Sequence, residues 1–394
     1  MTEQAKVPEI RFAGFTDPWE QRKLSEVATF GGGHTPPMAD PDNYEDGYVL
    51  WVTSQDVKSN YLDRTTTQIT EKGAKELTLY PAGSLVMVTR SGILRHTLPV
   101  AELRKPSTVN QDIRVILPQG ECCGEWLLQF FISHNKELLL EFGKTGTTVE
   151  SVDFGKIKDM LLYMPSTVEQ QQIGDFFAKL DSLITLHQRK YDKLVVFKKS
   201  MLEKMFPKDG ESVPEIRFAG FTDPWEQRKA SEVFQIVDDR GHPTLPVLSA
   251  TQNQGMIYRD DSGRYIGHDE SNEIGYKRVL PGDFVVHLRS FQGGFAHSQY
   301  EGITSPAYTV FRAKEPTSHS DRFWKHWFMS EHFIAGLSTV TYGIRDGRSI
   351  SVDEFMNTFL AFPAVEEQAA ISRLFDYLDD LITLHQRKRL WFAK

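Results

Sequence analysis

Cysteine is nearly missing from this sequence. Its 394 residues include two, Cys122 and Cys123, and these are adjacent. Adjacent cysteines suit neither an ordinary disulfide nor the paired ligands of a zinc site. The sequence also lacks an apolar run approaching the roughly 18 residues of a membrane span, and its first residues lack the apolar core of a signal peptide. We therefore expect a cytoplasmic protein without a membrane segment.

Catalytic signatures are equally scarce. The Asn-Pro-Pro-Tyr and Asp-Pro-Pro-Tyr tetrapeptides of amino-methyltransferases do not occur, and the 12 histidines form no His-x3-His ligand pair. Pro41-Asp42 followed by Asp56-Val57-Lys58 does fit the spacing of a PD-(D/E)xK nuclease, in which two carboxylates hold a divalent metal beside a lysine. The pattern is short and has no counterpart later in the chain. It leaves a metal-dependent nuclease using Asp42, Asp56 and Lys58 as an alternative function.

Positive charge is also in deficit. Lys and Arg number 45 against 53 Asp and Glu, which gives a formal net charge of −8 at pH 7. The field of the whole molecule therefore repels phosphate, and binding of nucleic acid would have to rest on local patches or on a partner. The length and the 40% content of hydrophobic residues are sufficient for two or three globular domains.

What the sequence does contain is a long internal repeat. Val7–Lys23 recurs without change as Val213–Lys229, an offset of 206 residues (213 − 7), and the octapeptide Leu183–Lys190 recurs as Leu381–Lys388, an offset of 198 (381 − 183). Each half of the chain therefore consists of a flank, a variable block and a helix-forming segment. Unlike blocks could read unlike ligands, while like flanks and helices could present the same docking surface twice.

The helix-forming segments follow a coiled-coil pattern. Apolar residues recur every seven positions over about five heptads from Ser166 to Phe206, and a shorter copy follows near the end of the sequence. Ser166 and Glu169 form an S-x-x-E capping box, and Pro207 with Gly210 marks the far end. We expect two helices packed against each other. Their predicted core comprises Ile173, Phe177, Leu180, Ile184, His187, Leu194, Ile371, Phe375, Leu378, Ile382 and His385.

The variable blocks are rich in short apolar runs bounded by Gly, Pro, Asn and Asp, which predicts strands and turns. Leu85–Thr89 aligns with Phe284–Leu288, Glu125–Leu140 and Asp321–Leu337 are expected to be helices, and Phe30–Gly33 a loop. The predicted fold class is α+β, with two mixed α/β domains joined by two long helices in a pseudo-two-fold tandem repeat. The expected boundaries are 1–165 and 207–363 for the flanks with their blocks, and 166–206 and 364–394 for the helices.

Polar and basic side chains gather at predicted loops of both blocks. Arg pairs favourably with guanine and Gln with adenine in the major groove, whereas Ser, Thr and Lys suit phosphates. As a set, these side chains are candidates for contact with DNA. In the first block they are Thr53, Ser54, Gln55, Arg90, Ser91, Arg95, His96, Gln111, Lys144 and Thr147, and in the second Thr251, Gln252, Arg289, Ser290, Gln292, Arg345 and Arg348.

The first helix is basic toward its C-terminal end. Between His187 and Lys208 it carries seven Lys and Arg residues against Asp192 and Glu203. A solvated helix face and a contact surface for phosphate or for an acidic partner both fit this composition.

The chain resembles the specificity subunits of type I restriction–modification systems over nearly its whole length. The resemblance rests on the tandem order of block and helix and on short motifs that occur in the same order. These are Trp51–Asp56 (WVTSQD), Val109–Ile113 (VNQDI), Gly146–Val149 (GTTV) and a Pro-x-x-x-Glu-Gln at the start of each helix, at Pro165–Gln170 and Pro363–Gln368.

This resemblance implies two target-recognition domains held apart by an antiparallel helix pair, with each domain reading one half of a split site in double-stranded DNA. It implies that the helices set the spacer and that the chain itself has no catalytic activity, cofactor or metal. Two methylation subunits using S-adenosylmethionine, and restriction subunits using ATP and Mg, are the implied partners. Partners that enclose the DNA would also supply the positive field that this chain lacks.

Two features depart from the family pattern. The second helix has Ala364 where the first has Ser166, and loss of such a cap costs about 1 kcal/mol. The sequence also stops at Lys394, before a counterpart of Leu194–Met205 is complete. The helix pair is therefore expected to be shorter than usual. A scaffold whose two blocks dock two proteins is the second alternative function.

Overall fold

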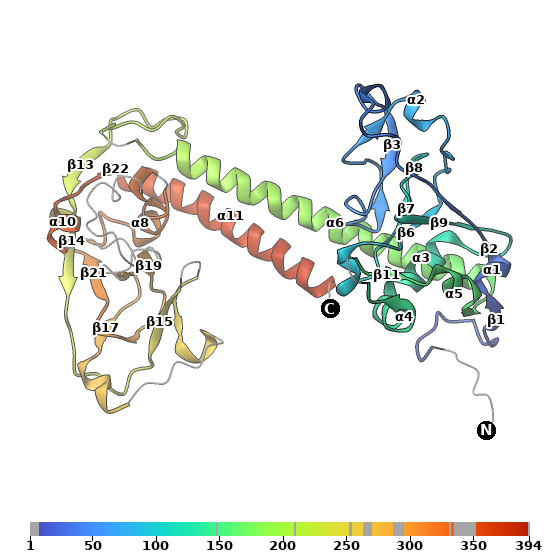
Figure 1. Cartoon of the computed structure of the whole chain (residues 1–394). Coiled ribbons are helices and arrows are strands. Elements are labelled where there is room, and N and C mark those ends of the chain that lie inside the picture. The colour runs from blue at the N-terminus through green and yellow to red at the C-terminus, as the bar shows by residue number, and fades with distance from the viewer. Residues whose placement is uncertain are drawn as a thin grey trace. The chain divides into compact units, whose positions relative to one another are not determined.

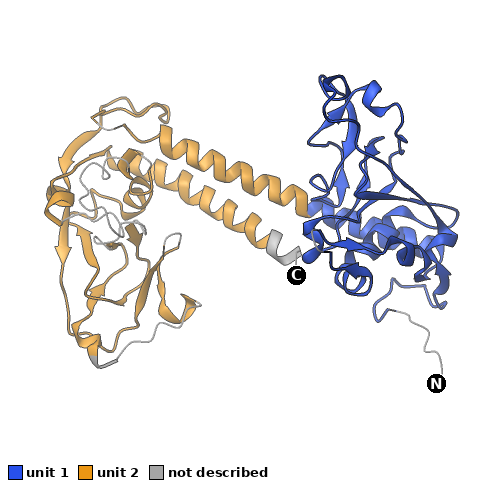
Figure 2. Cartoon of the chain, in the orientation of Figure 1, with its two compact units in different colours: residues 1–183 blue, residues 184–394 orange. Residues whose placement is uncertain are grey.

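The computed structural model of the protein describes residues 8–146, 149–208, 210–251, 254–262, 270–286, 295–330, 332–334 and 352–392. The chain divides into two compact units, residues 1–183 and residues 184–394 (Figure 2). The division falls within the long helix α6 (Thr167–Lys204), so each unit contains part of that helix. The helix predicted at 166–206 agrees with α6 to within two residues at each end.

A five-stranded sheet of order β2-β9-β6-β7-β4 forms the centre of unit 1 (Figure 1). Its middle strand β6 (Leu85–Val88) is entirely apolar and buried, because a hydrophobic core covers each face of the sheet. Leu85 and Met87 belong to one core and Val86 and Val88 to the other, as the two-residue period of a strand requires. The other strands are β2 (Ala28–Gly32), β4 (Tyr61–Leu62), β7 (Val100–Leu103) and β9 (Ile113–Pro118).

A smaller sheet of order β5-β3-β8 contributes to the second of these cores. In it, β3 (Val49–Val52) runs parallel to β8 (Thr108–Val109) and antiparallel to β5 (Gln68–Ile69). The parallel pairing places the chain segments that follow β3 and β8 side by side. The remaining elements of unit 1 are β1 (Glu20–Lys23), β10 (Gly143–Lys144), β11 (Ser151–Val152), β12 (Leu161–Met164), α1 (Leu24–Val27), α2 (Glu71–Ala74) and α5 (Phe154–Asp159).

The helix expected at Glu125–Leu140 is two helices, α3 (Gly124–Ser133) and α4 (Asn135–Phe142). They meet at His134, whose φ of −95° and ψ of 13° lie outside the helical region. The Asn135 side chain accepts hydrogen bonds from Leu98 N and Thr97 Oγ1, both 3.0 Å long. Asn competes with helical hydrogen bonds in this way, so the tertiary contact with residues 97 and 98 divides the helix.

The start of α6 confirms half of the predicted capping box. Ser166 Oγ accepts the backbone N–H of Glu169 at 3.4 Å. The Glu169 carboxylate does not return the bond to Ser166. It accepts from Arg11, with Nε to Oε1 at 2.8 Å and Nη2 to Oε2 at 2.6 Å. This bidentate pair, here named the flank clasp, attaches the N-terminal flank to the long helix.

Unit 2 repeats this plan with different residues. Its four-stranded sheet has the order β14-β21-β18-β19, and a cluster rich in Phe and Trp packs against it. Its elements are β13 (Glu226–Lys229), β14 (Phe234–Val237), β15 (Leu248–Thr251), β16 (Gly255–Tyr258), β17 (Lys277–Val279), β18 (Phe284–Val286), β19 (Phe295–His297), β20 (Gly302–Thr304), β21 (Thr309–Ala313), β22 (Phe359–Phe362), α7 (Ala230–Val233), α8 (Asp321–Trp327), α10 (Val352–Asn357) and α11 (Val365–Phe392).

The helix expected at Asp321–Leu337 begins at Asp321, but α8 already ends at Trp327. Ser330 Oγ donates to Trp327 O at 2.8 Å and accepts from Phe333 N at 3.4 Å, so a hydroxyl group replaces regular helical hydrogen bonds there. Residues 335–337 lie outside the described residues. Of the strand expected at Phe284–Leu288, the first three residues are β18, and the last two are likewise outside the described residues.

Within unit 2, the part of α6 beyond residue 183 runs antiparallel to α11 (Figure 1). His187 Nδ1 lies 2.8 Å from His385 Nδ1, and Lys198 forms an ion pair with Asp379. The contacting residue numbers rise along α6 and fall along α11, as they do in an antiparallel pair. The two helices that were expected to pack against each other are therefore in contact, and they meet at His187 and His385.

The predicted helix-pair core needs a correction. Ile371, Phe375 and Leu378 are buried, but they share one core with α8 and the sheet of unit 2, and Leu194 packs against the same core. Phe177, the counterpart of Phe375, is 42% exposed. Many of the apolar side chains that were predicted to pack between the two helices therefore pack against the domains instead. In unit 1, Ile173 packs on the core that contains α3, and Leu180 is half-buried. In unit 2, Ile184 and Ile382 are half-buried.

Among the described residues, every helix is either too short or too polar to cross a lipid bilayer.

Candidate nucleic-acid interface

Three loops meet at one edge of unit 1. The loop after β8 is held to the end of β3 by the bond from Asn110 N to Val52 O at 3.0 Å. The loop after β6 is held to the loop after β8 by two bonds to Asp112 O, from Thr89 N at 2.8 Å and Thr89 Oγ1 at 3.0 Å. These contacts bring the predicted segments Thr53–Gln55, Arg90–Ser91 and Gln111 together, although they are far apart in the sequence. This convergence is here named the reading edge.

The Thr53–Asp56 turn forms the first part of the reading edge. Asp56 Oδ2 accepts from both Thr53 N and Thr53 Oγ1 at 2.8 Å, and Asp56 Oδ1 accepts from Thr66 N at 2.7 Å. Burial raises the pKa of Asp56, but the hydrogen bonds from Thr66 and Thr53 outweigh it, so that pKa lies below its usual value. Asp56 therefore stays ionised and fixes a turn that presents Ser54 and Gln55.

These contacts contradict the nuclease interpretation of Asp42, Asp56 and Lys58. Both Asp56 oxygens are occupied by the turn, and Asp42 pairs with Lys72, its Oδ2 lying 2.9 Å from Nζ. Within the described residues, neither aspartate belongs to a group of three or more His, Cys, Asp or Glu side chains with the spacing of metal ligands. The short pattern matched a nuclease motif because turn-forming aspartates are common in loops.

The glycine-rich segment after Phe30 is a strand where a loop was expected, since β2 extends to Gly32. Tyr80 Oη accepts from Gly32 N at 2.8 Å and donates to Gly32 O at 2.7 Å, and a Cβ at Gly31 or Gly33 would collide with Tyr80 or with the backbone of Val109. The close approach brings the next residues to the reading edge. There Thr35 Oγ1 donates to Gln111 Oε1 at 2.6 Å.

The predicted cations of unit 1 are not equivalent. Arg90 is exposed and has no ion-pair partner among the described residues. Arg95 pairs with Glu150, and Lys144 Nζ lies 2.9 Å from Asp153 Oδ2. Arg90 is therefore immediately available to a phosphate or a base, whereas Arg95 and Lys144 would first have to leave a carboxylate.

Arg114 is a further cation that the sequence analysis missed. It lies on β9 opposite Gly32, and its guanidinium fills the space that a side chain at Gly32 would occupy. Among the described residues it has no ion-pair partner. Its place in a strand concealed it, although its proximity to Asn110–Asp112 in the sequence was a usable signal.

The remaining predicted contacts of unit 1 have mixed environments. Ser91 Oγ accepts from Ile93 N at 3.5 Å and therefore caps a short 3-10 helix, and Ser91 N donates to Glu150 O at 3.1 Å. His96, at the end of that helix, is exposed. These residues border the reading edge on the side of Arg90.

Unit 2 offers one described residue from the predicted set. Thr251 Oγ1 donates to Gly255 O at 2.8 Å and accepts from Gln254 N at 3.1 Å, so it stabilises the turn between β15 and β16. Seven predicted contacts lie outside the described residues: Thr147, Gln252, Arg289, Ser290, Gln292, Arg345 and Arg348.

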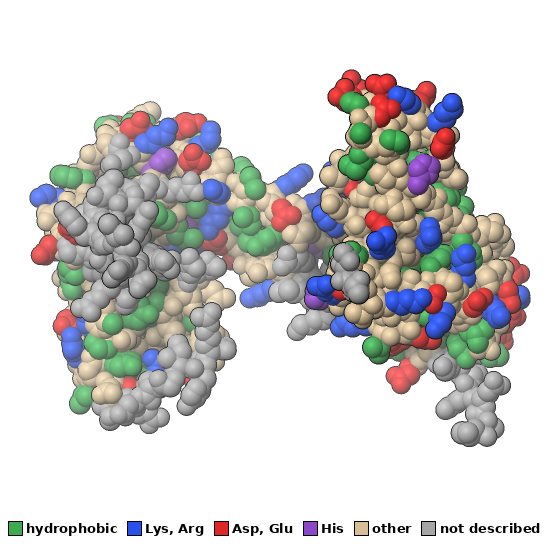
Figure 3. All heavy atoms as spheres, in the orientation of Figure 1, with side chains coloured by type: hydrophobic (Ala, Val, Ile, Leu, Met, Phe, Trp, Pro, Cys, Tyr) green, Lys and Arg blue, Asp and Glu red, His purple; other side chains and the backbone are tan. Residues whose placement is uncertain are grey.

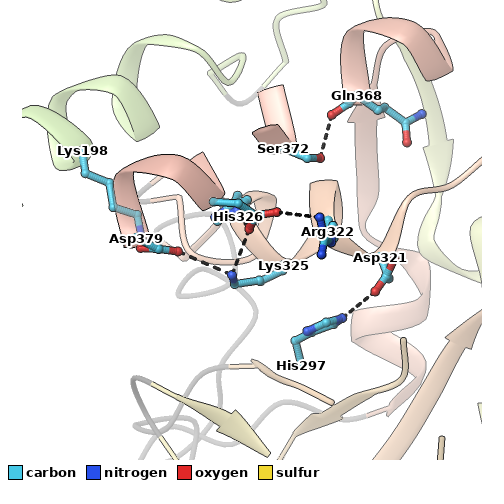
Figure 4. A network of polar contacts seen from close by, with 10 residues as sticks. Lys198, His297, Asp321, Arg322, Lys325, His326, Gln368, Ser372 and Asp379 are labelled. Atoms are coloured by element: carbon cyan, nitrogen blue, oxygen red, sulfur yellow. Dashed lines mark hydrogen bonds and ion pairs between the residues drawn. The ribbon is translucent and has the colours of Figure 1, made fainter. Parts of the chain in front are cut away.

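A partly buried network of charges joins α8 to both long helices in unit 2 (Figure 4). Lys325 Nζ lies 3.2 Å from Asp376 Oδ1 and 3.4 Å from Asp379 Oδ2. Arg322 Nη1 lies 3.4 Å from Asp376 Oδ2, and Lys198 pairs with Asp379. Burial opposes ionisation of Asp376, yet the contacts with His326 and Lys325 hold its pKa at about 2.

Within the described residues, His326, Asp376 and Asp379 form the one group that has the spacing of metal ligands. The ammonium of Lys325 already bridges the two carboxylates, and Lys198 and Arg322 add two more positive charges. A divalent cation would have to displace Lys325 against this charge. The arrangement is therefore an internally compensated network that fixes α8 on α11.

The visible surface of unit 1 carries charges of both signs. Figure 3 shows acidic side chains with basic ones beside them at the tip near α2, and several basic side chains on the body below it, with acidic ones along its edge. A molecule of negative net charge can thus present surface regions that do not repel phosphate.

Comparison with known proteins agrees with this architecture. Residues 16–195 match the family described as the type I restriction modification DNA specificity domain. The specificity subunit of the type I restriction enzyme MjaVIII from Methanocaldococcus jannaschii is 22% identical over 396 residues, covering 94% of this chain and 88% of the relative. An Escherichia coli type I restriction enzyme specificity subunit is 29% identical over 186 residues. That alignment covers 44% of this chain and spans about half of the relative, 46%.

A solved structure shows the same fold. The S subunit of the type I restriction–modification system of M. genitalium matches with a TM-score of 0.56 at 9% identity, covering 98% of this chain and 96% of that one. Taken together, the repeat, the two α/β units and the long helices define a protein with two unlike domains built on one repeated framework. Residues 16–195 thus resemble a type I restriction modification DNA specificity domain, and the chain is similar over most of its length to a type I restriction enzyme specificity subunit.

Proposed function

We propose that this chain is the DNA-specificity subunit of a type I restriction–modification complex and that each unit reads one half of a bipartite site in duplex DNA. The observation that carries the proposal is the repeated flank clasp. Arg217 donates to Glu367 through Nε to Oε1 at 2.9 Å and Nη2 to Oε2 at 2.6 Å, nearly the same distances as in the pair of Arg11 and Glu169.

A second repeated contact supports the same conclusion. Gln170 Oε1 accepts from Cys123 N at 2.8 Å, and Gln368 Oε1 accepts from Ser320 N at 3.0 Å. The first contact fixes α3 on α6, and the second fixes α8 on α11. Each recognition domain is therefore mounted on its long helix by the same polar groups, while the surfaces that the domains present differ.

The reading edge of unit 1 supplies groups suited to DNA. Gln55 and Arg90 are exposed, and Arg and Gln pair with the major-groove edges of guanine and adenine. Thr and Ser side chains nearby suit phosphate oxygens. We propose that this edge enters the major groove at one half-site, and that unit 2 reads the other half-site.

The helices would then set the spacer, and the repeated surfaces would dock two methylation subunits. The exact repeat of Val7–Lys23 as Val213–Lys229 gives a partner two like flanks to recognise, as pseudo-two-fold assembly requires. The chain itself would be non-catalytic. S-adenosylmethionine would bind to the methylation subunits, and ATP and Mg to the restriction subunits.

The test is methylation-site mapping on genomic DNA from cells expressing this chain with its methylation subunits. We expect a split motif with a fixed gap that disappears when this chain is left out. A complex that assembles but adds no methylated motif would contradict the proposal and favour the scaffold alternative.

A change of spacing tests the role of the helices separately. Insertion of one heptad into each long helix, beside the shared octapeptide, should lengthen the gap and leave both half-site sequences unchanged. An unaltered gap in a folded, active complex would show that the helices do not set it.

A further inference from the structure

A concentration of positive charge lies where the two copies of the octapeptide meet in unit 2. His187 and His385 face each other at 2.8 Å between their Nδ1 atoms, with ring centroids 5.0 Å apart. Each histidine is followed by Gln-Arg-Lys. The four cations Arg189, Lys190, Arg387 and Lys388 are here named the central basic patch.

Symmetry places equivalent members of this patch on one face. His187 and His385 are equivalent residues, so a local two-fold axis passes through their contact. For two antiparallel helices, such an axis is perpendicular to the plane that contains both helix axes. Rotation about it exchanges the two helices, and a residue on one face of the pair is carried to the same face. Lys190 and Lys388 therefore share a face, separated by about 9 Å along the helix direction at 1.5 Å per residue.

The central basic patch lacks internal compensation. All four cations are exposed, and none forms an ion pair among the described residues. Other helix cations in unit 2 do: Lys198 pairs with Asp379, and Lys204 Nζ lies 2.7 Å from Glu215 Oε1.

The nearby carboxylates are engaged elsewhere or stand apart. Asp192 accepts from Gln188 at 2.7 Å, and Asp379 is held by Lys198 and Lys325. Asp380 precedes Lys388 by eight residues, about 12 Å along the helix. The patch thus retains its positive field.

The pKa of His385 responds to this field. Burial lowers the pKa of His385, and His187, Lys190 and Lys388 lower it further. Lys190 comes from α6 and Lys388 from α11, so both helices direct positive charge at the pair. The histidine contact joins the helices, and the cations around it are left to attract an anion.

We propose that the central basic patch binds backbone phosphates of the spacer DNA between the two half-sites. This inference rests on the proposed function, which brings a duplex to both recognition domains. Duplex DNA carries one negative charge per ~1.7 Å, and its two strands are related by local two-fold axes. A symmetric pair of lysines therefore matches symmetric phosphates on opposite strands.

Such a contact carries no sequence information. Phosphate contacts fix position and register, whereas base edges specify sequence. The patch would strengthen binding to a spacer of any sequence and would make that binding sensitive to salt. It would give the helices a direct contact with DNA in addition to their proposed role in setting the spacer.

The experiment measures the salt dependence of binding by the complex of the full chain with its methylation subunits, on a duplex carrying the mapped site. The test variant is Lys190→Gln with Lys388→Gln. The control, Lys136→Gln with Arg373→Gln, removes the same charge from exposed residues outside the patch. We expect the slope of log affinity against log salt to fall by about 1.8 in the test variant, at about 0.9 per phosphate, and to change less in the control.

A second duplex with uncharged methylphosphonates across the spacer sharpens the test. It should weaken the unmodified complex and have a much smaller effect on the test variant, because the partners of the missing phosphates are already gone. Half-site preference should be unchanged in all proteins.

The outcomes separate the two proposals. Selective binding by the unmodified complex with an unchanged slope in the test variant would overturn the phosphate contact and leave the proposed function intact. Loss of the methylation subunits from the test variant would also overturn it, in favour of a protein contact. Absence of selective binding by the unmodified complex would reject the proposed function, and the inference with it.

Discussion

Unit 1 and unit 2 attach their domains to the long helices by the same clasp but fill the space beside it differently. In unit 1, Asp181 accepts from Asn60 at 2.9 Å and from Gln129 at 3.4 Å. In unit 2, its counterpart Asp379 belongs to the ionic network with Lys198 and Lys325. Neutral amides serve one unit where fixed charges serve the other.

The apolar contacts with the long helices also differ between the two units, and they are more extensive in unit 2. Phe375 is fully buried, because Phe206, two residues beyond the end of α6, stacks on it at a centroid distance of 5.8 Å, whereas its counterpart Phe177 is 42% exposed. Phe206 also stacks on Trp327 at 5.6 Å. The comparison teaches that a repeated framework fixes orientation through a few polar groups, while the depth of each domain's core depends on which segment arrives to cover it.

The largest expected effect concerns Phe206. Phe206→Ala should destabilise unit 2 by about 3–5 kcal/mol, because the side chain is fully buried among aromatic rings. Phe176→Ala, which removes an edge contact with Phe12 from a half-exposed position, should cost under about 1 kcal/mol. Urea unfolding combined with hydrogen exchange of α8 and α3 peptides measures both. Similar losses would contradict the difference in packing.

The flank clasp should behave alike in the two units. Glu169→Gln and Glu367→Gln each replace a buried carboxylate that accepts two bonds from Arg, so each should cost about 1.5–3 kcal/mol. Exchange of backbone amides at the start of α6 and of α11 reports the two losses separately. A loss confined to one unit would show that the two clasps contribute unequally to stability despite their similar geometry.

Recognition should instead be confined to one unit. Arg90→Ala is expected to reduce discrimination at one half-site by about 1–3 kcal/mol and to leave the other unchanged. Arg95→Ala is the matched control, because its guanidinium is paired with Glu150 and should contribute less. Competition binding with base-substituted half-sites provides the measurement. Equal losses at both half-sites would reject the assignment of Arg90.

A pH-dependent effect is expected from Glu102 in unit 1. Burial and the adjacent Glu125 raise the pKa of Glu102 to about 7. The folded state therefore holds a proton that the unfolded state releases above its lower pKa. Stability should fall as pH rises from about 4.5 to about 7 and level off above that, with a slope of at most about 1.4 kcal/mol per pH unit. Thermal unfolding of Glu102→Gln should lack this slope, and its persistence would assign the titration elsewhere.

Much of the architecture was predictable because it depends on residues that are close together in the sequence. A heptad pattern and a capping serine placed α6 to within two residues. The motifs Trp51–Asp56 and Val109–Ile113 mark the two loops that β3 and β8 bring together. The break at His134 was not predictable, because it depends on Asn135 bonding to residues 97 and 98. The nuclease pattern failed for a similar reason, since Asp56 is committed to a turn with Thr53 and Thr66.

The sequence by itself determined the repeat, the long helices, the flank and block order, and the resemblance to specificity subunits, because these depend on residue identity and period along the chain. The tertiary structure decided how each residue is used. Glu169 binds Arg11 and does not complete the predicted capping box. Phe375 packs in the core of unit 2 and not in a seam between the helices. Arg95 forms an ion pair with Glu150, whereas Arg90 has no ion-pair partner among the described residues. The physical reason is that burial and ion pairing depend on neighbours distant in the sequence, which local patterns do not specify.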